Sequence, residues 1–170
     1  METWDLFDST RQPLFRTHRR GEKIPPGEYH TVIEVWTVDS NKNVLVTLRD
    51  PNKEEYPNKW ENTGGSALAG ESSKQAAVRE LHEETGIIAA EDELSLLGTY
   101  KEPSAFIDIY LLRRDISISQ LTMQEGETVA AKWVTLQQLD TMIDDETLAL
   151  PTGKRLASVR KAFQKHLDLF

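Results

Sequence analysis

The stretch GSALAGESSKQAAVRELHEETGI, residues 65–87, says more about the fold and chemistry of this chain than any other segment. It begins in a glycine-containing loop and continues into a predicted helix. Ser72 and Gln75 have the spacing of a capping box, so the helix is expected to begin near Ser73. The following residues are mostly good helix formers, and Gly86 is well placed to end the helix in a left-handed conformation.

Acidic residues of this helix fall on one face. Glu80, Glu83 and Glu84 occupy positions i, i+3 and i+4, so their carboxylates lie on a common patch, beside an apolar stripe that can pack on a sheet. Like charges at this spacing destabilise a helix unless a cation lies among them. Oxygen ligands suit Mg²⁺ or Mn²⁺ better than zinc. For these residues alone, the alternative is a solvated acidic face that Arg79 and Lys74 partly neutralise.

The full spacing, G-x5-E-x7-REL-x-EE-x-G-I, resembles the Nudix box of hydrolases that cleave diphosphates linked to another moiety. Because the whole pattern is in register, the metal-binding interpretation is favoured over the solvated face. The resemblance implies an α/β fold of the Nudix type, in which a mixed sheet lies between helices as an α/β/α sandwich. It covers about residues 29–143. It also implies attack of water on phosphorus and release of two monophosphorylated products.

The same resemblance suggests roles for individual residues. The metal ligands would be the carbonyl of Gly64 and the carboxylates of Glu80, Glu83 and Glu84, with Mg²⁺ as the expected ion and Mn²⁺ as the alternative. Arg79 is expected to hold Glu71 or Glu80 through a charge-assisted bond. Family members differ in which glutamate serves as the general base, and Glu80 is the first choice here.

A glutamate from the loop before a late strand often completes the metal shell in that family. In this chain the loop is Gln124-Glu125-Gly126-Glu127. Glu127 is the better candidate for a catalytic role and Glu125 the second. A solvated loop acid is the equally weighted alternative for either one.

The flanking segments resemble the branch of Nudix proteins related to isopentenyl-diphosphate isomerase. These segments are residues 4–8, 27–30 and 60–63. That isomerase uses a cysteine and a metal-binding histidine at positions where this chain has Gly64 and Ser66, and the chain contains no cysteine. Isomerase chemistry by that route is therefore excluded and hydrolysis is favoured. His30 matches another metal histidine of that enzyme, but a strand-start residue with local hydrogen bonds is the preferred interpretation.

Composition narrows the remaining function classes. A chain of 170 residues is expected to form one domain, with an N-terminal extension over 1–28 and a C-terminal helix over about 154–169. A net charge of −8 argues against binding of a nucleic acid polymer, but not against a small phosphorylated substrate. The absence of cysteine, of a signal peptide and of a long apolar run predicts a cytoplasmic protein without a membrane segment. A homodimer is left open because dimers are frequent in that family.

Alternating and β-rich segments predict most of the sheet. Strands are expected at 30–38, 44–49, 94–100, 106–114 and 129–135, with a short one from Trp60 and a hairpin around residues 4–15. Helices are expected at 136–143 and 154–169. Since no repeating βαβ order appears, a mixed sheet with helices on both faces is predicted. Residues 16–28 and 50–59 are expected to be loops.

Two questions stay open at the level of sequence. A module that keeps the box but senses a nucleotide without cleaving it is the alternative to an enzyme. The identity of the substrate is also open, because specificity would lie in the loops 16–28, 50–59 and 102–105. Trp60, Tyr100 and Phe106 could stack on a base, or could equally be core residues.

Overall fold

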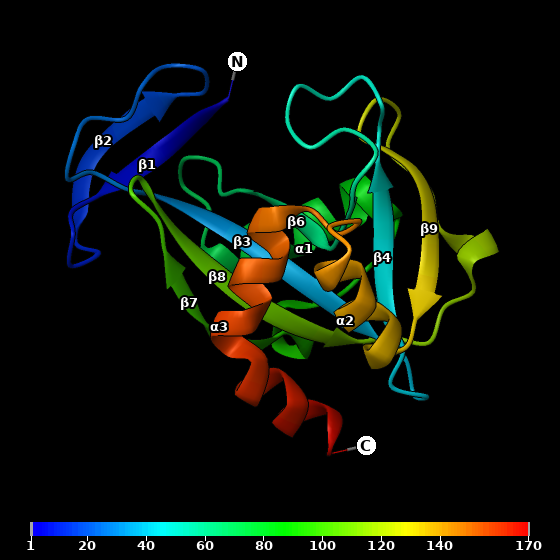
Figure 1. The fold of residues 1–170 in the computed structure, drawn as a ribbon. Helices are drawn as coiled ribbons and strands as arrows, with labels where there is room; N and C mark the ends of the chain where they lie inside the picture. Colours follow the sequence, from blue (N-terminus) through cyan, green and yellow to red (C-terminus); the bar gives the residue numbers. More distant parts are fainter. Residues whose placement is uncertain (1, 170) are drawn as a thin grey trace.

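The computed structural model describes residues 2–169, and a mixed β-sheet forms its centre (Figure 1). This sheet has seven strands: β3 (His30–Val38), β4 (Val44–Arg49), β5 (Trp60–Glu61), β6 (Thr63–Ser66), β7 (Ser95–Lys101), β8 (Ala105–Arg113) and β9 (Thr128–Val134). The prediction of a mixed α/β fold is confirmed.

Strand β3 is the axis of the sheet. It pairs in parallel with β8 along its whole length, from His30 opposite Ala105 to Val38 opposite Arg113. It also pairs antiparallel with β6, which places the loop before the box helix against the central strand. Strands β3 and β8 are buried on both faces, which explains their nearly continuous apolar sequences.

The sheet divides beyond the β3–β4 turn. Strands β3 and β4 pair at Val38 and Val44, and β4 then pairs along its length with β9 and near its end with β5. On the far side, β7 pairs antiparallel with β8. In Figure 1 the β4–β9 pair stands apart from the β3–β8–β7 group.

Helices cover both faces of the sheet. Helix α1 (Ser73–Thr85) packs on one face through Ala76, Ala77 and Leu81, against Ile33 and Val35 of β3. Helices α2 (Leu136–Asp144) and α3 (Leu150–Leu167) cover the other face, around a separate core. Figure 1 shows α2 and α3 in front of the sheet and α1 behind it. Two short 3-10 turns, Glu91–Glu93 and Ile118–Gln120, lie in the connections.

The ends of the helices follow local chemistry. Ser72 caps α1, the capping box with Gln75 is formed, and Gly86 adopts a left-handed conformation with φ of 73°, all as predicted. Helix α3 begins at Leu150, one turn earlier than predicted. Pro151 lies in its first turn, where the missing N–H has no intrahelical partner to lose.

The N-terminal segment forms a separate two-stranded hairpin of β1 (Thr3–Phe7) and β2 (Pro13–Arg19). The prediction of a loop over 16–28 is wrong for its first residues. Thr17 to Arg19 pair with β1, so β2 extends to Arg19. Among the helices of residues 2–169, none combines the length and apolar character that crossing a bilayer requires.

Candidate active site

Helix α1 and the loop before it place the box carboxylates at one end of the sheet. The apolar side of α1 is fixed against the sheet, so Glu80, Glu83 and Glu84 point toward strand β6 and its glycines. The three carboxylates differ in burial: Glu84 is buried, Glu80 is half-buried and Glu83 is exposed. One helix therefore supplies three acids whose exposure to solvent decreases from Glu83 to Glu80 to Glu84.

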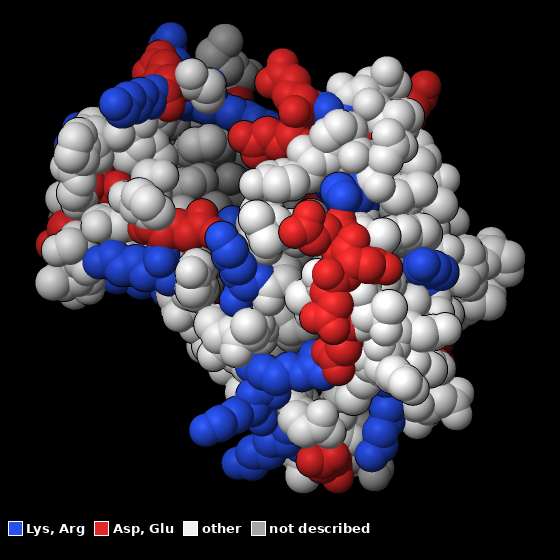
Figure 2. All heavy atoms as spheres, in the orientation of Figure 1, with Lys and Arg blue, Asp and Glu red and all other residues white. Residues whose placement is uncertain are grey.

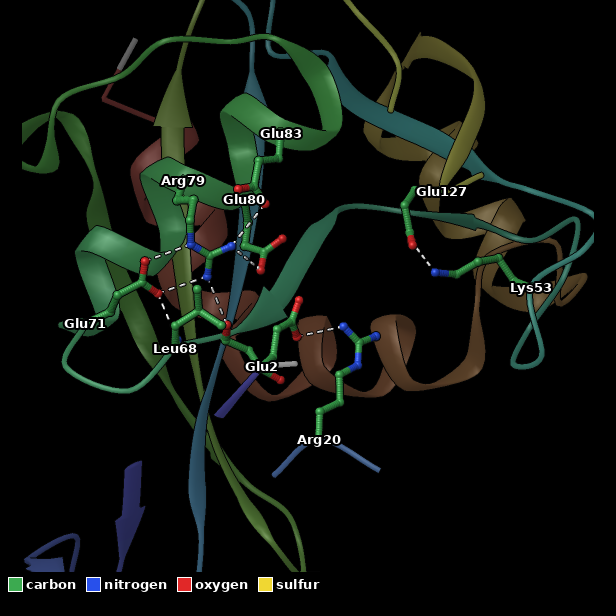
Figure 3. Close-up of polar contacts among 10 residues, drawn as sticks. Glu2, Arg20, Lys53, Leu68, Glu71, Arg79, Glu80, Glu83 and Glu127 are labelled. Carbon is green, nitrogen blue, oxygen red and sulfur yellow. Dashed lines mark hydrogen bonds and ion pairs between the residues drawn. The ribbon is translucent and has the colours of Figure 1, made fainter. Parts of the chain in front are cut away.

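Arg79 connects the acids of the box. Its Nε and Nη2 donate to the two carboxylate oxygens of Glu71 at 2.7 and 2.9 Å, and its Nη1 donates to Glu80 at 2.9 Å and to Glu83 at 3.1 Å. Nη2 also reaches the carbonyl of Ser66 at 3.1 Å. Figure 3 shows the guanidinium enclosed by these partners. The bond expected from Arg79 to Glu71 or Glu80 is thus made to both, and it ties the helix to the preceding loop.

Gly65 leaves room for one of these carboxylates. A Cβ built on Gly65 would lie 2.2 Å from the Glu80 carboxyl carbon and 2.2 Å from its Oε1. No side chain larger than hydrogen fits at this position unless Glu80 moves. The glycine of the motif therefore acts here through the space it leaves and not through an unusual φ.

Glu84 is the most deeply placed acid of the group. Burial raises the pKa of Glu84 well above its ordinary value, and the negative charges of Glu61 and Glu80 raise it further. A hydrogen bond from the backbone N–H of Gly64 offsets part of this effect, so Gly64 and Glu84 are neighbours. Burial likewise raises the pKa of Glu80, although the hydrogen bond from Arg79 opposes that change. Such crowding of acids in a partly dry site favours binding of a cation or a proton.

These acids share one cavity of about 350 Å³. The cavity brings together the predicted Gly64, Glu80, Glu83, Glu84 and Glu127, although the last comes from a distant loop. Arg79 lies beside the cavity and orients the carboxylates of Glu80 and Glu83, which line it. The lining residues are Glu2, Trp4, Arg20, Arg49, Lys53, Gly64, Gly65, Ser66, Glu80, Glu83, Glu84, Gln124 and Glu127.

Glu127 faces the box from the opposite wall. Its carboxylate forms an ion pair with Lys53, and the N–H of Asp50 donates to its carbonyl at 2.9 Å. Figure 3 shows Lys53 and Glu127 on the far side of the cavity from Arg79. Glu125 is exposed and is not among the lining residues. Of the two loop glutamates, Glu127 is therefore the one placed to act.

His30 is buried away from these carboxylates. Its ring stacks on Trp4 with centroids 4.2 Å apart, and burial lowers its pKa to about 4. The backbone N–H of His30 donates to the carbonyl of Ser104. Its ring Nδ1 has no hydrogen-bond partner within residues 2–169. His30 is the first residue of β3, as expected, and its ring is held by stacking on Trp4 in place of a hydrogen bond at Nδ1.

Within residues 2–169, no group of three or more His, Asp or Glu side chains is arranged so that it could hold a metal ion. Nη1 of Arg79 pairs with both Glu80 and Glu83, so in this structure a guanidinium lies between these two carboxylates. The metal ligands named from the sequence are therefore brought to one cavity, and their coordination stays a prediction.

Several residues of the cavity have no signal in the sequence. Arg49 ends β4 and donates to both oxygens of Glu61 at 2.9 and 2.8 Å, and Lys53 lies in the loop after it. Glu2, Trp4 and Arg20 come from the N-terminal hairpin segment and the residues that flank it. No motif spacing links these residues to the box, because contacts between segments far apart in the sequence bring them to it.

Comparison with known proteins agrees with this geometry. Residues 28–154 match the family model described as the NUDIX domain. The chain belongs to the Nudix family. It is 38% identical over 143 residues to an uncharacterized Nudix hydrolase of Listeria monocytogenes, a match that covers 84% of this chain and 85% of the relative. As a Nudix hydrolase, the chain acts on pyrophosphate bonds.

Solved structures show the same fold. A Deinococcus radiodurans protein, DR0079, superposes with a TM-score of 0.76 at 22% identity, over 95% of this chain and 99% of that one. The NUDIX domain of NrtR from Shewanella oneidensis, solved in complex with ADP ribose, gives a TM-score of 0.63 at 16% identity, over 85% of this chain and 92% of that domain. The Nudix fold is thus confirmed, and the resemblance to the isomerase-related branch stays a prediction.

Proposed function

We propose that this Nudix hydrolase cleaves a diphosphate linked to another moiety, such as a nucleoside diphosphate derivative, with the help of Mg²⁺. The observation that carries the proposal is that Glu80, Glu83, Glu84 and Glu127 line one cavity although they come from two distant segments. Family membership supports the pyrophosphate bond as the target, and Nudix hydrolases generally need a divalent metal. Mn²⁺ is the alternative ion.

The donor chemistry of the cavity suits a hard divalent cation, and binding would require Glu80 and Glu83 to turn from Arg79 toward the ion. Every candidate ligand offers oxygen, and Glu84 is buried near the charges of Glu61 and Glu80, a setting in which a nearby cation would favour its ionised form. The carbonyl of Gly64 and the carboxylates of Glu80, Glu83 and Glu84 would hold the ion. When bound, it would polarise phosphoryl oxygens and offset the charge that develops on them.

The chain itself supplies a base and the means to position it. Glu80 is our first choice because burial raises its pKa from the ordinary value, which makes it a better proton acceptor, and because Arg79 fixes its orientation. Glu127 is the alternative, and it would first have to leave the ion pair with Lys53. The partner is expected to be a small phosphorylated molecule in the cytoplasm.

The test is turnover on a panel of nucleoside diphosphates, nucleotide sugars and non-nucleotide diphosphates with Mg²⁺, read out as released monophosphate. We expect turnover by the wild type and a loss of at least about 100-fold in Glu83→Gln, with the Tm unchanged within about 2 °C, because this exposed side chain contributes little to packing. Glu91→Gln, an exposed acid outside the cavity, is the matched control.

Two outcomes would count against the proposal. Tight binding of a nucleotide without turnover would indicate the sensing module instead. Full turnover by Glu83→Gln would show that the box carboxylates are not needed for the reaction. Comparison of Glu80→Gln with Glu127→Gln identifies the general base. In the variant that lacks the base, kcat no longer falls as the pH is lowered.

A further inference from the structure

The N-terminal hairpin lies outside the matched residues 28–154, yet it is docked on the box loop. The N–H of Ala69 donates to the carbonyl of Thr3 at 2.8 Å, and the N–H of Gly70 donates to the Asp5 carboxylate at 2.8 Å. The other end of the hairpin is held by Arg11, which bonds both oxygens of Asp108 at 2.7 and 2.5 Å. The hairpin is therefore fixed at both ends relative to α1.

One edge of this docked hairpin forms a wall of the hydrolytic cavity. Trp4 lines the cavity with its ring stacked on His30, and Arg20 follows the last residue of β2 at the cavity rim. The N–H of Arg20 donates to the carbonyl of Glu2 at 3.0 Å, which fixes the backbone beneath the side chain. In Figure 3, Arg20 and Glu2 lie on the opposite side of the Arg79 cluster from α1.

The cavity has three cations in its lining, and they differ in how firmly they are held. Arg49 is mostly buried and forms an ion pair with Glu61, while Lys53 forms one with Glu127. Arg20 pairs with Glu2, and these side chains are 61% and 46% exposed. An ion pair this exposed is worth about 0–1 kcal/mol, so a stronger anion can displace Glu2 at little cost.

The hydrogen-bond donors of Arg20 are only partly used, and its neighbours keep the guanidinium charged. The pKa of Arg20 is raised, first by the hydrogen bond with Glu2 and to a smaller degree by the charges of Glu127 and Glu80 on the cavity walls. A guanidinium carries five N–H donors in a planar fork, and the structure shows one Nη–carboxylate contact for it, with Glu2. Donors are therefore left for phosphate oxygens.

We propose that Arg20, held at the cavity rim by the hairpin, binds a phosphate of the substrate and so determines its affinity. This inference rests on the proposed function. Arg20 contacts the substrate without taking part in proton transfer, because the candidate bases lie on α1 and on the loop before β9. Its loss should thus weaken binding and leave the chemical step in place.

The experiment compares wild type with Arg20→Ala, Arg20→Lys and Glu2→Gln on whichever panel substrate the wild type cleaves best with Mg²⁺. We expect Arg20→Ala to raise KM about tenfold with kcat within about twofold, since the lost bonds are charge-assisted. Arg20→Lys should recover part of the affinity, because it keeps the charge but loses the fork. Arg19→Ala, an exposed neighbour outside the lining, is the control and should match the wild type.

Glu2→Gln separates substrate binding from a structural ion pair. If Arg20 binds phosphate, Glu2 competes with the substrate, and Glu2→Gln lowers KM. If the pair only stabilises the hairpin, Glu2→Gln raises KM as Arg20→Ala does, and the inference is overturned. An unchanged KM in Arg20→Ala, with normal wild-type turnover, overturns it while the proposed function stands. A wild type without turnover on any substrate overturns both.

Discussion

At the scale of single residues, Gly65 shows how the motif works by leaving space. We predict that Gly65→Ala lowers kcat by roughly 10- to 100-fold, because its Cβ would displace the Glu80 carboxylate that it would meet at 2.2 Å. The Tm should change little, since the displaced group is the end of a flexible side chain. Enzyme assays and differential scanning calorimetry measure the two effects.

The control is another glycine to alanine change. Gly153→Ala lies in α3, where the new Cβ would make ordinary contacts of 3.5 Å and longer. It should raise stability by up to about 1 kcal/mol and leave kcat unchanged. Unaltered kcat in Gly65→Ala would contradict the role of Glu80.

His30 makes stability depend on pH in a definite direction. Burial lowers its pKa from 6.5 to about 4, so between these values the unfolded chain binds a proton that the folded chain does not. The stability that neutral His30 contributes is complete above pH 6.5 and is lost as the pH falls toward 4. The loss is at most about 3 kcal/mol.

We therefore predict that His30→Phe, which keeps an aromatic ring against Trp4, flattens the fall in unfolding free energy between pH 6.5 and 4. Urea unfolding at several pH values measures this slope. His82→Gln, on the exposed face of α1, is the matched control. Equal slopes in wild type and His30→Phe would show that His30 is protonated in the folded state.

At the scale of elements, the junction between the hairpin and α1 depends on a buried carboxylate. Asp108 on β8 accepts hydrogen bonds from Arg11, from Thr99 at 2.6 Å and from Ser73 in the first turn of α1 at 2.6 Å. Burial raises the pKa of Asp108, but these bonds more than offset it, so the pKa lies below its ordinary value. One side chain thus connects hairpin, sheet and box helix.

We predict that Arg11→Ala destabilises the protein by about 2–3 kcal/mol, because it leaves the Asp108 charge buried without its cation. The double variant Arg11→Ala/Asp108→Asn should recover part of this loss. A double-mutant cycle by urea unfolding gives the coupling energy. A coupling near zero would mean that the hairpin is held by its other contacts alone. If Arg11→Ala also raises KM, the anchor of the hairpin and the cavity wall are linked.

At the scale of the whole molecule, charge is unevenly distributed. The net charge is −8, yet Figure 2 shows acidic side chains in a band on one face, bordered by basic ones. The active-site cavity repeats this arrangement, with carboxylates facing Arg20, Arg49 and Lys53. A divalent cation that binds only the folded state should therefore stabilise the entire chain.

We predict that Mg²⁺ at about 100 times its Kd raises the Tm by about 5–10 °C, equivalent to about 2.7 kcal/mol. Choline chloride at the same ionic strength controls for screening. Glu83→Gln should lose most of the shift. An identical shift with choline chloride would attribute the effect to general screening and not to a site.

The elements that could be predicted from sequence are those whose causes are local. The capping box at Ser72, the left-handed Gly86 and the apolar strands β3 and β8 depend on neighbours along the chain, so their patterns are legible without a structure. The early start of α3 and the extension of β2 to Arg19 were not predicted. The N–H of Ala149, just before α3, donates to the carbonyl of the distant Trp60, whereas the end of β2 pairs with the neighbouring strand β1. In both cases these contacts override a weak local preference.

The same division applies to the site. The sequence by itself determined the family, the helix and the row of carboxylates, because the spacing of a helix places Glu80, Glu83 and Glu84 together without further information. Only the tertiary structure decided that Glu127 and not Glu125 faces them, and that Arg20, Arg49 and Lys53 surround them. These residues meet through strand pairing across long loops, and the closure of such loops leaves no periodic trace in the sequence.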